Sequence, residues 1–172
     1  MNGLDVSSNN AIIDWNQVKY DSFCPEFVYI KSCEGVGYND PRRALNSENA
    51  KNAGLKIGYY HFSSLNNIDI IKDSTDEANY FMKSISLLPK ADLPPVLDIE
   101  TNKLNLPKEK VLQWINNFIK VMQKSYPVVV LYSYAPFLNF NLPDNHNLGS
   151  IPLWHAQYPL NYTPEMSPTL PH

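Results

Sequence analysis

The sequence lacks any long hydrophobic run and any strong excess of one charge. Its longest purely aliphatic run, residues 128–131, is far shorter than the ~20 apolar residues that a membrane-spanning helix needs. A formal net charge of −3 gives no basic surface for nucleic acid or for an anionic membrane. We therefore expect no nucleic-acid partner and no membrane insertion, and a partner that is a small molecule or a polymer not recognised by its charge.

Signals for export and for a second domain are also missing. Met1 is followed at once by NGLDVS, which predicts that the chain as given carries no cleavable signal peptide, so that export uses another route or a removed segment, and a phage endolysin would be cytoplasmic until released. There is no internal repeat, no low-complexity linker and no glycine-rich loop for a phosphate group. We expect a single domain over residues 1–172, because this length suffices for one sizeable hydrophobic core.

Cysteine is scarce, with one residue at position 24 and one at position 33. The two cysteines bracket FVYIKS, which has the composition of a strand. At ~3.3 Å per residue the strand ends lie roughly 20 Å or more apart, beyond the reach of a disulfide. We therefore expect two free thiols. No Cys-His-Asn arrangement is evident near Cys33, so a small buried thiol is expected there in preference to a nucleophile.

Short apolar runs recur along the chain with helical stretches between them. The runs lack a clean alternation, which is typical of strands covered on both faces of a parallel sheet, and antiparallel hairpins are not expected. The predicted strands are residues 3–6, 27–32, 56–61, 95–99, 128–132 and 152–156. Alternating strands and helices predict right-handed βαβ units, hence an α/β fold that is either a (β/α) barrel or a doubly wound sheet.

The predicted helices follow the 3.6-residue period of their apolar side chains. Residues 42–53 form one helix closed by Gly54, and residues 108–124 form another with Pro107 in its first turn. A third helix lies within STDEANYFMKSI, where Ser74 and Glu77 have the spacing of a capping box. After residue 132 the chain is rich in Pro and Asn without helical periodicity, which predicts loops or a tail.

The stretch PPVLDIET, residues 94–101, ends an apolar strand in two acids. Side chains at i and i+2 of a strand point the same way, so Asp98 and Glu100 share one face while Leu97 and Ile99 pack on the other. In a parallel barrel this end of the strand carries the active site. Because the two charges repel, the proton affinity of one of the two carboxyls is raised. One neutral and one ionised carboxyl are the groups that hydrolyse glycosides.

An isolated Asp-x-Glu has other interpretations. It can be a pair of metal ligands, the centre of a salt-bridge network, or two solvated acids where a strand leaves its sheet, since perturbed carboxylates also occur in structural networks. The motif by itself leaves all of these open.

The whole chain resembles glycoside hydrolase family 25, the muramidases or lysozymes of bacteria, phages and some fungi. The motifs that carry the resemblance stand in the family's order and span nearly the whole chain: GLDVS (3–7), IDW (13–15), FVYIKSCEG (27–35) followed by YNDP, AGLKIGYYHF (53–62), LPPVLDIE (93–100), LYS (131–133) and PLWHAQY (152–158). Any one of these motifs is weak evidence, but GLDVS, YHF and LDIE together are specific.

The resemblance implies a modified (β/α) barrel of the (β/α)5β3 type that acts at the cell wall. It implies cleavage of the β-1,4 bond between N-acetylmuramic acid and N-acetylglucosamine in peptidoglycan, with no metal and no cofactor. By the matching positions, Glu100 is the acid/base, Asp98 is the anion that stabilises the reacting N-acetyl group or the oxocarbenium ion, and Asp5 is a supporting carboxylate.

Several further residues have both a functional and a structural interpretation. Tyr60 can donate its hydroxyl to the substrate's acetamido group or pack in the barrel, and we favour the first. Glu34 binds sugar or holds Lys31. Tyr132 and Trp154 lie at later strand ends, where they stack on sugar rings or pack in the core.

Two more landmarks are expected to be structural. His61 is interpreted as a core histidine and not as a base, and Asp14 with Trp15 as the anchor of a loop to a helix beside the first strand.

The chain departs from the family after SPTLPH, because it stops at His172 where the family continues with two more strands. We expect the barrel to lack its last strands, which leaves unpaired edges on the first and sixth strands and favours self-association. This departure also supports a second hypothesis, a wall-binding module with a preserved cleft that turns over poorly or not at all.

Overall fold

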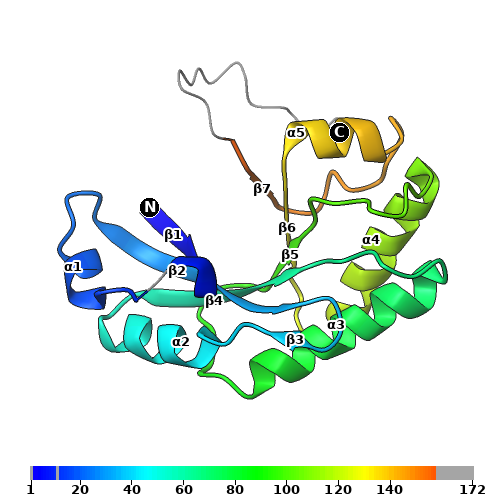
Figure 1. Ribbon diagram of the computed structural model, residues 1–172. Helices are drawn as coiled ribbons and strands as arrows, with labels where there is room; N and C mark the ends of the chain where they lie inside the picture. The colour runs from blue at the N-terminus through cyan, green and yellow to red at the C-terminus, as the bar shows by residue number, and fades with distance from the viewer. Residues whose placement is uncertain (1, 11, 158–172) are drawn as a thin grey trace.

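A computed structural model describes residues 2–10 and 12–157 of the chain, and its strands form one strongly curled sheet (Figure 1). The sheet has the order β1-β2-β4-β5-β6-β7, and every neighbouring pair in this order is parallel. The strands are β1 (Asn2–Val6), β2 (Pro25–Glu34), β4 (Lys56–Phe62), β5 (Val96–Asp98), β6 (Val130–Ser133) and β7 (Leu153–His155). The predicted α/β barrel class is confirmed, as a partial barrel.

A short strand outside this order contradicts the expectation that antiparallel hairpins are absent. β3 (Tyr38–Asn39) pairs antiparallel with the end of β2. The chain reverses between the two strands through Gly35 and Gly37, whose φ angles of 49° and 103° suit glycine and few other residues. Two glycines two residues apart therefore mark a tight turn. They are the sequence signal for this hairpin, which the pattern of apolar runs does not contain.

Helices cover the outer face of the curled sheet (Figure 1). They are α1 (Trp15–Lys19), α2 (Arg43–Asn52), α3 (Ile70–Ser86), α4 (Lys108–Met122) and α5 (Ala135–Asn141), with a 3-10 turn, η1 (Ser8–Asn10), after β1. The helices predicted over residues 42–53 and 108–124 are confirmed as α2 and α4.

The capping box predicted at Ser74 is wrong, because α3 begins one turn earlier. Asp69 is the N-cap and accepts a hydrogen bond from the backbone N–H of Lys72 at 3.2 Å. Ser74 lies inside the helix, where its Oγ donates to the carbonyl of Ile70 at 2.6 Å and accepts from Asn117 Nδ2 of α4 at 2.8 Å. The Ser74 hydroxyl therefore serves the packing of α3 on α4, although its spacing from Glu77 is that of a capping box.

The expectation of loops after residue 132 is also wrong in part. α5 has a proline in its first turn and buries only Phe137 and Leu138. A helix of two turns with two buried residues has too few apolar positions to show a period. The predicted loop or tail within PLNYTPEMSPTLPH lies outside the described residues.

Inside the barrel, glycines make room for the large inward rings of β2. A Cβ atom on Gly3 would lie 2.1 Å from the ring of Phe27, and one on Gly58 would lie 2.3 Å from the ring of Tyr29. Gly3 is the register partner of Phe27, and Gly58 is that of Tyr29. The two rings therefore fill the barrel interior below the carboxyl ends of the strands.

The state of the two cysteines and the lack of a membrane-spanning helix can be checked over the described residues. Cys24 is exposed and Cys33 is buried, and both thiols are free as expected. No helix in residues 2–10 and 12–157 is long and apolar enough to cross a membrane.

Candidate active site

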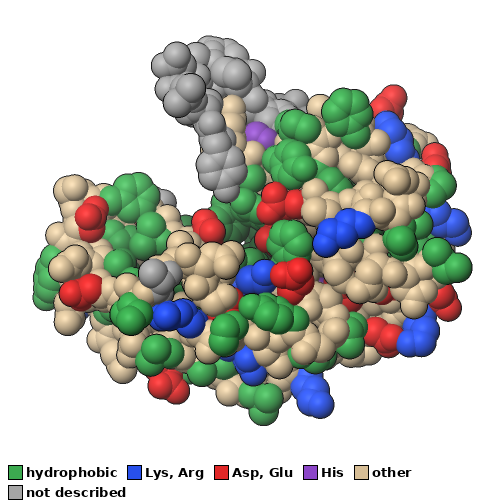
Figure 2. Space-filling view, viewed as in Figure 1, with side chains coloured by type: hydrophobic (Ala, Val, Ile, Leu, Met, Phe, Trp, Pro, Cys, Tyr) green, Lys and Arg blue, Asp and Glu red, His purple; other side chains and the backbone are tan. Residues whose placement is uncertain are grey.

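A pocket of about 260 Å³ opens at the carboxyl ends of the strands. Each of the six parallel strands, β1, β2, β4, β5, β6 and β7, contributes to it directly or through the loop that follows. Its lining residues are Asp5, Ser7, Asn9, Lys31, Tyr60, Phe62, Val96, Asp98, Glu100, Tyr132 and Trp154. Figure 2 shows the surface hollowed between the part around β1 and α1 and the part around α5.

β5 and the residues after it place the acid pair in this pocket. Val96, Asp98 and Glu100 line the pocket, whereas Leu97 and Ile99 are fully buried in the core on the other face. This is the alternation that the strand period predicted. The end of β5 is held on both sides, because the carbonyl of Asp98 accepts from Ser63 N at 2.8 Å and Ile99 N donates to the carbonyl of Tyr132 at 3.0 Å.

The two acids differ in burial, and this favours the neutral form of Asp98. Asp98 is only 6% exposed, while Glu100 is half-buried. Burial, followed by the negative charge of Glu100, raises the pKa of Asp98 to about 9, and the Lys31 ammonium opposes the rise. Asp98 Oδ1 is buried and accepts no hydrogen bond from the described residues. The general acid that the resemblance implies, Glu100, has to hold a proton to act, whereas burial in the fold favours the neutral form of Asp98.

Asp5 and Tyr60 bring a further carboxyl and a hydroxyl to the same pocket. Asp5 is exposed at the rim, and the removal of water from its carboxyl by neighbouring protein atoms raises its pKa. Burial and the charges of Asp98 and Asp5 raise the pKa of Tyr60. The Tyr60 hydroxyl therefore stays protonated and can donate a hydrogen bond.

Glu34 lies beside the pocket and is not among its lining residues. Its Oε2 accepts a hydrogen bond from Lys31 Nζ at 2.7 Å, which is the second of the two interpretations given for Glu34. Lys31 itself lines the pocket, and the sequence analysis did not name it as a site residue. Its position two residues after Tyr29 on β2 could have indicated this, because both side chains point into the barrel.

Tyr132 and Trp154 form an aromatic wall of the pocket. Their ring centroids are 5.0 Å apart in an edge-to-face arrangement, and Trp154 also contacts Tyr29 at 5.1 Å. Both residues are half-buried. Each ring therefore packs against its neighbours and still presents surface to the pocket.

A second pocket, of about 450 Å³, adjoins Glu100 on its other side. Its lining residues are Glu100, Tyr134, Ala135, Pro136, His155, Ala156 and Gln157. The Tyr134 hydroxyl donates to the carbonyl oxygen of Glu100 at 3.2 Å, which fixes the backbone between the two pockets. Among the described residues Glu100 is thus the one shared by both linings, and none of the other residues here was singled out as a site residue from the sequence.

His61, Cys33 and Asp14, which were interpreted as structural from the sequence, have structural contacts in the fold. His61 is fully buried, and its Nε2 lies 2.7 Å from Glu77 Oε2 while its Nδ1 lies 3.2 Å from Cys33 Sγ. Burial raises the pKa of the Cys33 thiol to about 12, so this thiol is a poor nucleophile. Asp14 caps α1 by accepting from Asn16 N at 3.0 Å.

No group of three or more His, Cys, Asp or Glu residues between positions 2 and 157, position 11 aside, is arranged to hold a metal ion.

Comparisons with known proteins agree with this geometry. The sequence profile of glycosyl hydrolases family 25 matches residues 4–170. The autolytic lysozyme of Clostridium acetobutylicum is 34% identical over 158 residues, which cover 92% of this chain and 45% of that protein. Lysozyme M1 of Streptomyces globisporus is 33% identical over 178 residues, covering 98% of this chain and 57% of that protein. The chain thus spans about half the length of these relatives.

A solved structure gives the same result for the fold. The bacterial lysozyme from Streptomyces coelicolor superposes with a TM-score of 0.76 at 30% sequence identity, and the match covers 92% of this chain and 74% of that one.

Proposed function

Because the chain belongs to glycoside hydrolase family 25, we propose that it is a lysozyme that acts on bacterial cell-wall peptidoglycan. The bond cleaved is the β-1,4 linkage between N-acetylmuramic acid and N-acetylglucosamine. The observation that carries the proposal is the joint position of Asp98 and Glu100 in one pocket with Asp5 and Tyr60. The names of the relatives, an autolytic lysozyme and lysozyme M1, support the same substrate.

Glu100 is assigned the proton transfer because of its place between the two pockets. A glycosidic bond joins two sugar rings, so rings seated in adjoining pockets would put their bridging oxygen beside the residue that both pockets share. Two interacting carboxyls titrate as a pair, and a bound sugar can move the single proton from Asp98 to Glu100. Glu100 then gives this proton to the bridging oxygen as the C–O bond breaks.

Asp98 is assigned the stabilisation of the positive charge that this step creates. Once its proton has passed to Glu100, its carboxylate either orients the substrate's N-acetyl oxygen toward the reacting carbon or stabilises the oxocarbenium ion directly. A water molecule completes the reaction by attacking that carbon and returning a proton to Glu100. Asp5 supplies further negative charge at the rim.

The reaction is proposed to retain the anomeric configuration. Side chains two residues apart at one strand end lie close together, which suits the ~5–5.5 Å carboxyl separation of retaining enzymes better than the ~6.5–9.5 Å of inverting ones. Tyr60 is proposed to donate its hydroxyl to the acetamido group, and Tyr132 and Trp154 to stack on the sugar rings.

A wall-binding module with weak or no turnover is the alternative. One observation favours it: burial favours the neutral form of Asp98 and raises its pKa to about 9, and Asp98 is not the carboxyl that is assigned the proton transfer. If bound sugar does not move that proton, the cleft binds its ligand without cleaving it.

Release of reducing sugar from purified peptidoglycan separates the two functions. The parent protein is expected to release sugar, and Glu100→Gln, which keeps the shape and loses the transferable proton, is expected to be slower by ~10²-fold or more while still sedimenting with insoluble walls. Equal rates for the two proteins contradict the role of Glu100. Wall binding without any sugar release by the parent supports the alternative, and a product of inverted configuration contradicts retention.

A further inference from the structure

Lys31 is the one cation among the described residues that line the acid-bearing pocket. Its side chain is only 13% exposed, so its ammonium group has given up most of its contact with water. Burial of a charge is unfavourable unless partners compensate for it. The burial of Lys31 beside three carboxyls therefore has to be compensated by its partners, and the charge of Lys31 acts on those carboxyls.

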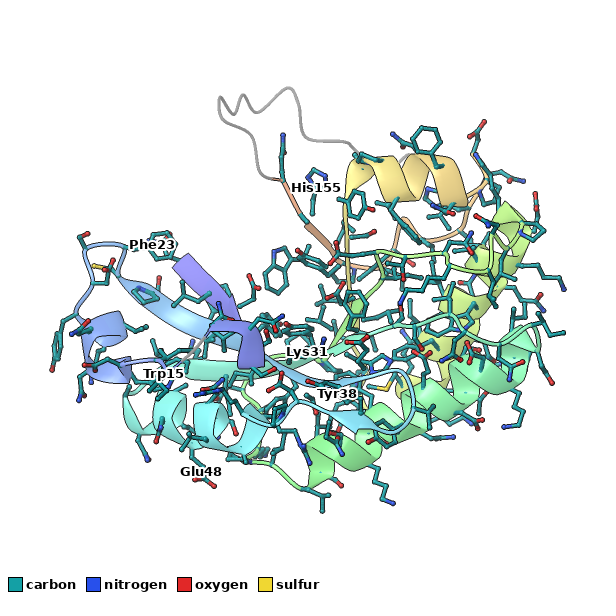
Figure 3. The ribbon with its side chains drawn as sticks, in the orientation of Figure 1. Trp15, Phe23, Lys31, Tyr38, Glu48 and His155 are labelled. Carbon is teal, nitrogen blue, oxygen red and sulfur yellow. The ribbon has the colours of Figure 1, made fainter. Side chains whose placement is uncertain are left out.

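Three side chains from three strands hold the Lys31 ammonium in place. Glu34 of β2 accepts its hydrogen bond at 2.7 Å, the ring of Phe62 of β4 lies 4.9 Å away, and the ring of Tyr38 of β3 lies 5.7 Å away. Both ring distances are within the ~6 Å range of cation–π attraction. Lys31 and Tyr38 lie close together near the middle of Figure 3. The ammonium is therefore held at a fixed place relative to the acids.

We propose that Lys31 is a positioning residue that sets the pH range in which the Asp98–Glu100 pair holds a single proton, and that Glu34 keeps the Lys31 ammonium in place for this purpose. The proposal rests on the proposed function, because a single proton on the pair is the state that can cleave a glycoside. It concerns neither a contact with the sugar nor a second active site.

The acidic groups around the pair act in the opposite direction. Ionised neighbours repel a second negative charge, so each of them favours protonation of the pair. They are Asp5 from β1, Glu34 from the end of β2 and Asp40 from the turn after β3, whereas Tyr60 from β4 and Tyr132 from β6 are phenols, and His155 from β7, at the second pocket, acts in the same direction as Lys31 when it carries a proton. Among the groups that act on Asp98, the Lys31 ammonium lowers its pKa whereas burial, Glu100 and Asp5 raise it.

The direction of the effect follows from charge. A nearby positive charge favours the ionised form of a carboxyl, so Lys31 lowers both proton-loss steps of the pair. Lys31→Met removes the charge and keeps much of the apolar stem. Both limbs of the bell-shaped pH profile of activity should then move to higher pH by about one unit, which is about a tenfold loss of rate on the acidic limb.

The test compares pH profiles of peptidoglycan hydrolysis for the parent, Lys31→Met, Lys31→Arg and Lys56→Met. Arg keeps the charge and should keep the parent's profile. Lys56 is exposed at the opposite end of β4, so its replacement makes the same change in net charge away from the pocket and should leave the profile in place. Should the Met variant not fold, Lys31→Gln gives the same comparison. A Lys31→Met profile that is lowered at every pH without moving would show a merely structural role and overturn the proposal.

A second measurement does not depend on activity. Carbon-13 carboxyl NMR can follow the titration of Asp98 in the parent and in Lys31→Met, with Asp98→Asn to assign the signal. We expect the Asp98 midpoint to rise by about one unit when the charge is removed. An unchanged midpoint overturns the proposal, whether or not the parent cleaves peptidoglycan. A raised midpoint in a protein without activity would support the role of Lys31 and contradict the proposed function alone.

Discussion

Tyr29 of β2 and Trp154 of β7 contact each other with ring centroids 5.1 Å apart, although β4, β5 and β6 lie between their strands in the sheet. Such a contact requires the sheet to curl until its two halves meet. The curl brings Asp5 of β1 and Trp154 of β7 to the same pocket as the acids of β5. This aromatic contact therefore supports the geometry of the site.

Replacement of Trp154 by alanine is expected to destabilise the protein and weaken the site together. Loss of a half-buried indole should reduce the free energy of unfolding by about 2 kcal/mol, below the range for fully buried Trp. Urea denaturation measures this change, and wall hydrolysis at a temperature where the variant is folded measures the second effect. Trp154→Phe keeps an aromatic ring at the contact and should recover most of both. An unchanged unfolding midpoint in Trp154→Ala would contradict a structural role for the contact.

Asp98→Asn is expected to stabilise the fold at alkaline pH. Burial raises the pKa of Asp98 to about 9, above the ~3.9 of an unfolded chain. Between these pH values the unfolded chain loses a proton that the folded protein retains, so the free energy of unfolding falls as the pH rises. The amide has no such charge, and the gain should reach about 0.5–2 kcal/mol near pH 9, the common yield of a single stabilising substitution.

Thermal unfolding of the parent and of Asp98→Asn at a series of pH values checks this prediction. The difference should vanish near pH 4, where both side chains are neutral. The same variant should be severely impaired in hydrolysis, because the transition state loses its anion. A variant less stable than the parent throughout the alkaline range would show that Asp98 is ionised in the fold.

The two thiols are expected to differ in reactivity while neither is needed for activity. Cys24 is exposed and Cys33 is buried against His61. A thiol reagent should therefore modify one cysteine in the native protein and two after unfolding. Cys33→Ala should keep wall hydrolysis and lose about 1 kcal/mol of stability through its smaller volume. Loss of hydrolysis in a folded Cys33→Ala protein would bring this thiol into the mechanism.

Self-association through strand edges remains a prediction. Within the described residues, β1 and β7 each pair with a strand on one side only. Unpaired N–H and C=O groups on such an edge can pair with another chain. Light scattering at rising protein concentration should show dimers or larger species. A monomer at high concentration with a single cooperative melt would argue against it.

Much of the site's framework follows from local periodicity in the sequence. A strand has a period of two, and this alone puts Asp98 and Glu100 on one face and Leu97 and Ile99 on the other. The helices over residues 42–53 and 108–124 and the free thiols follow from similarly local patterns. The family follows from motifs in their order along the chain.

Other features were decided only by contacts between residues far apart in the chain. Ser74 has the spacing of a cap, yet packing of α3 on α4 turns it toward Asn117. The proton was assigned to Glu100 by role, but Asp98 is the more deeply buried acid, and burial depends on the strands that close around it. Lys31 acquires its significance only when β2 curls toward β5. Sequence periodicity determines which way a side chain points, whereas the pKa of a group depends on the charges and the water that the fold leaves near it.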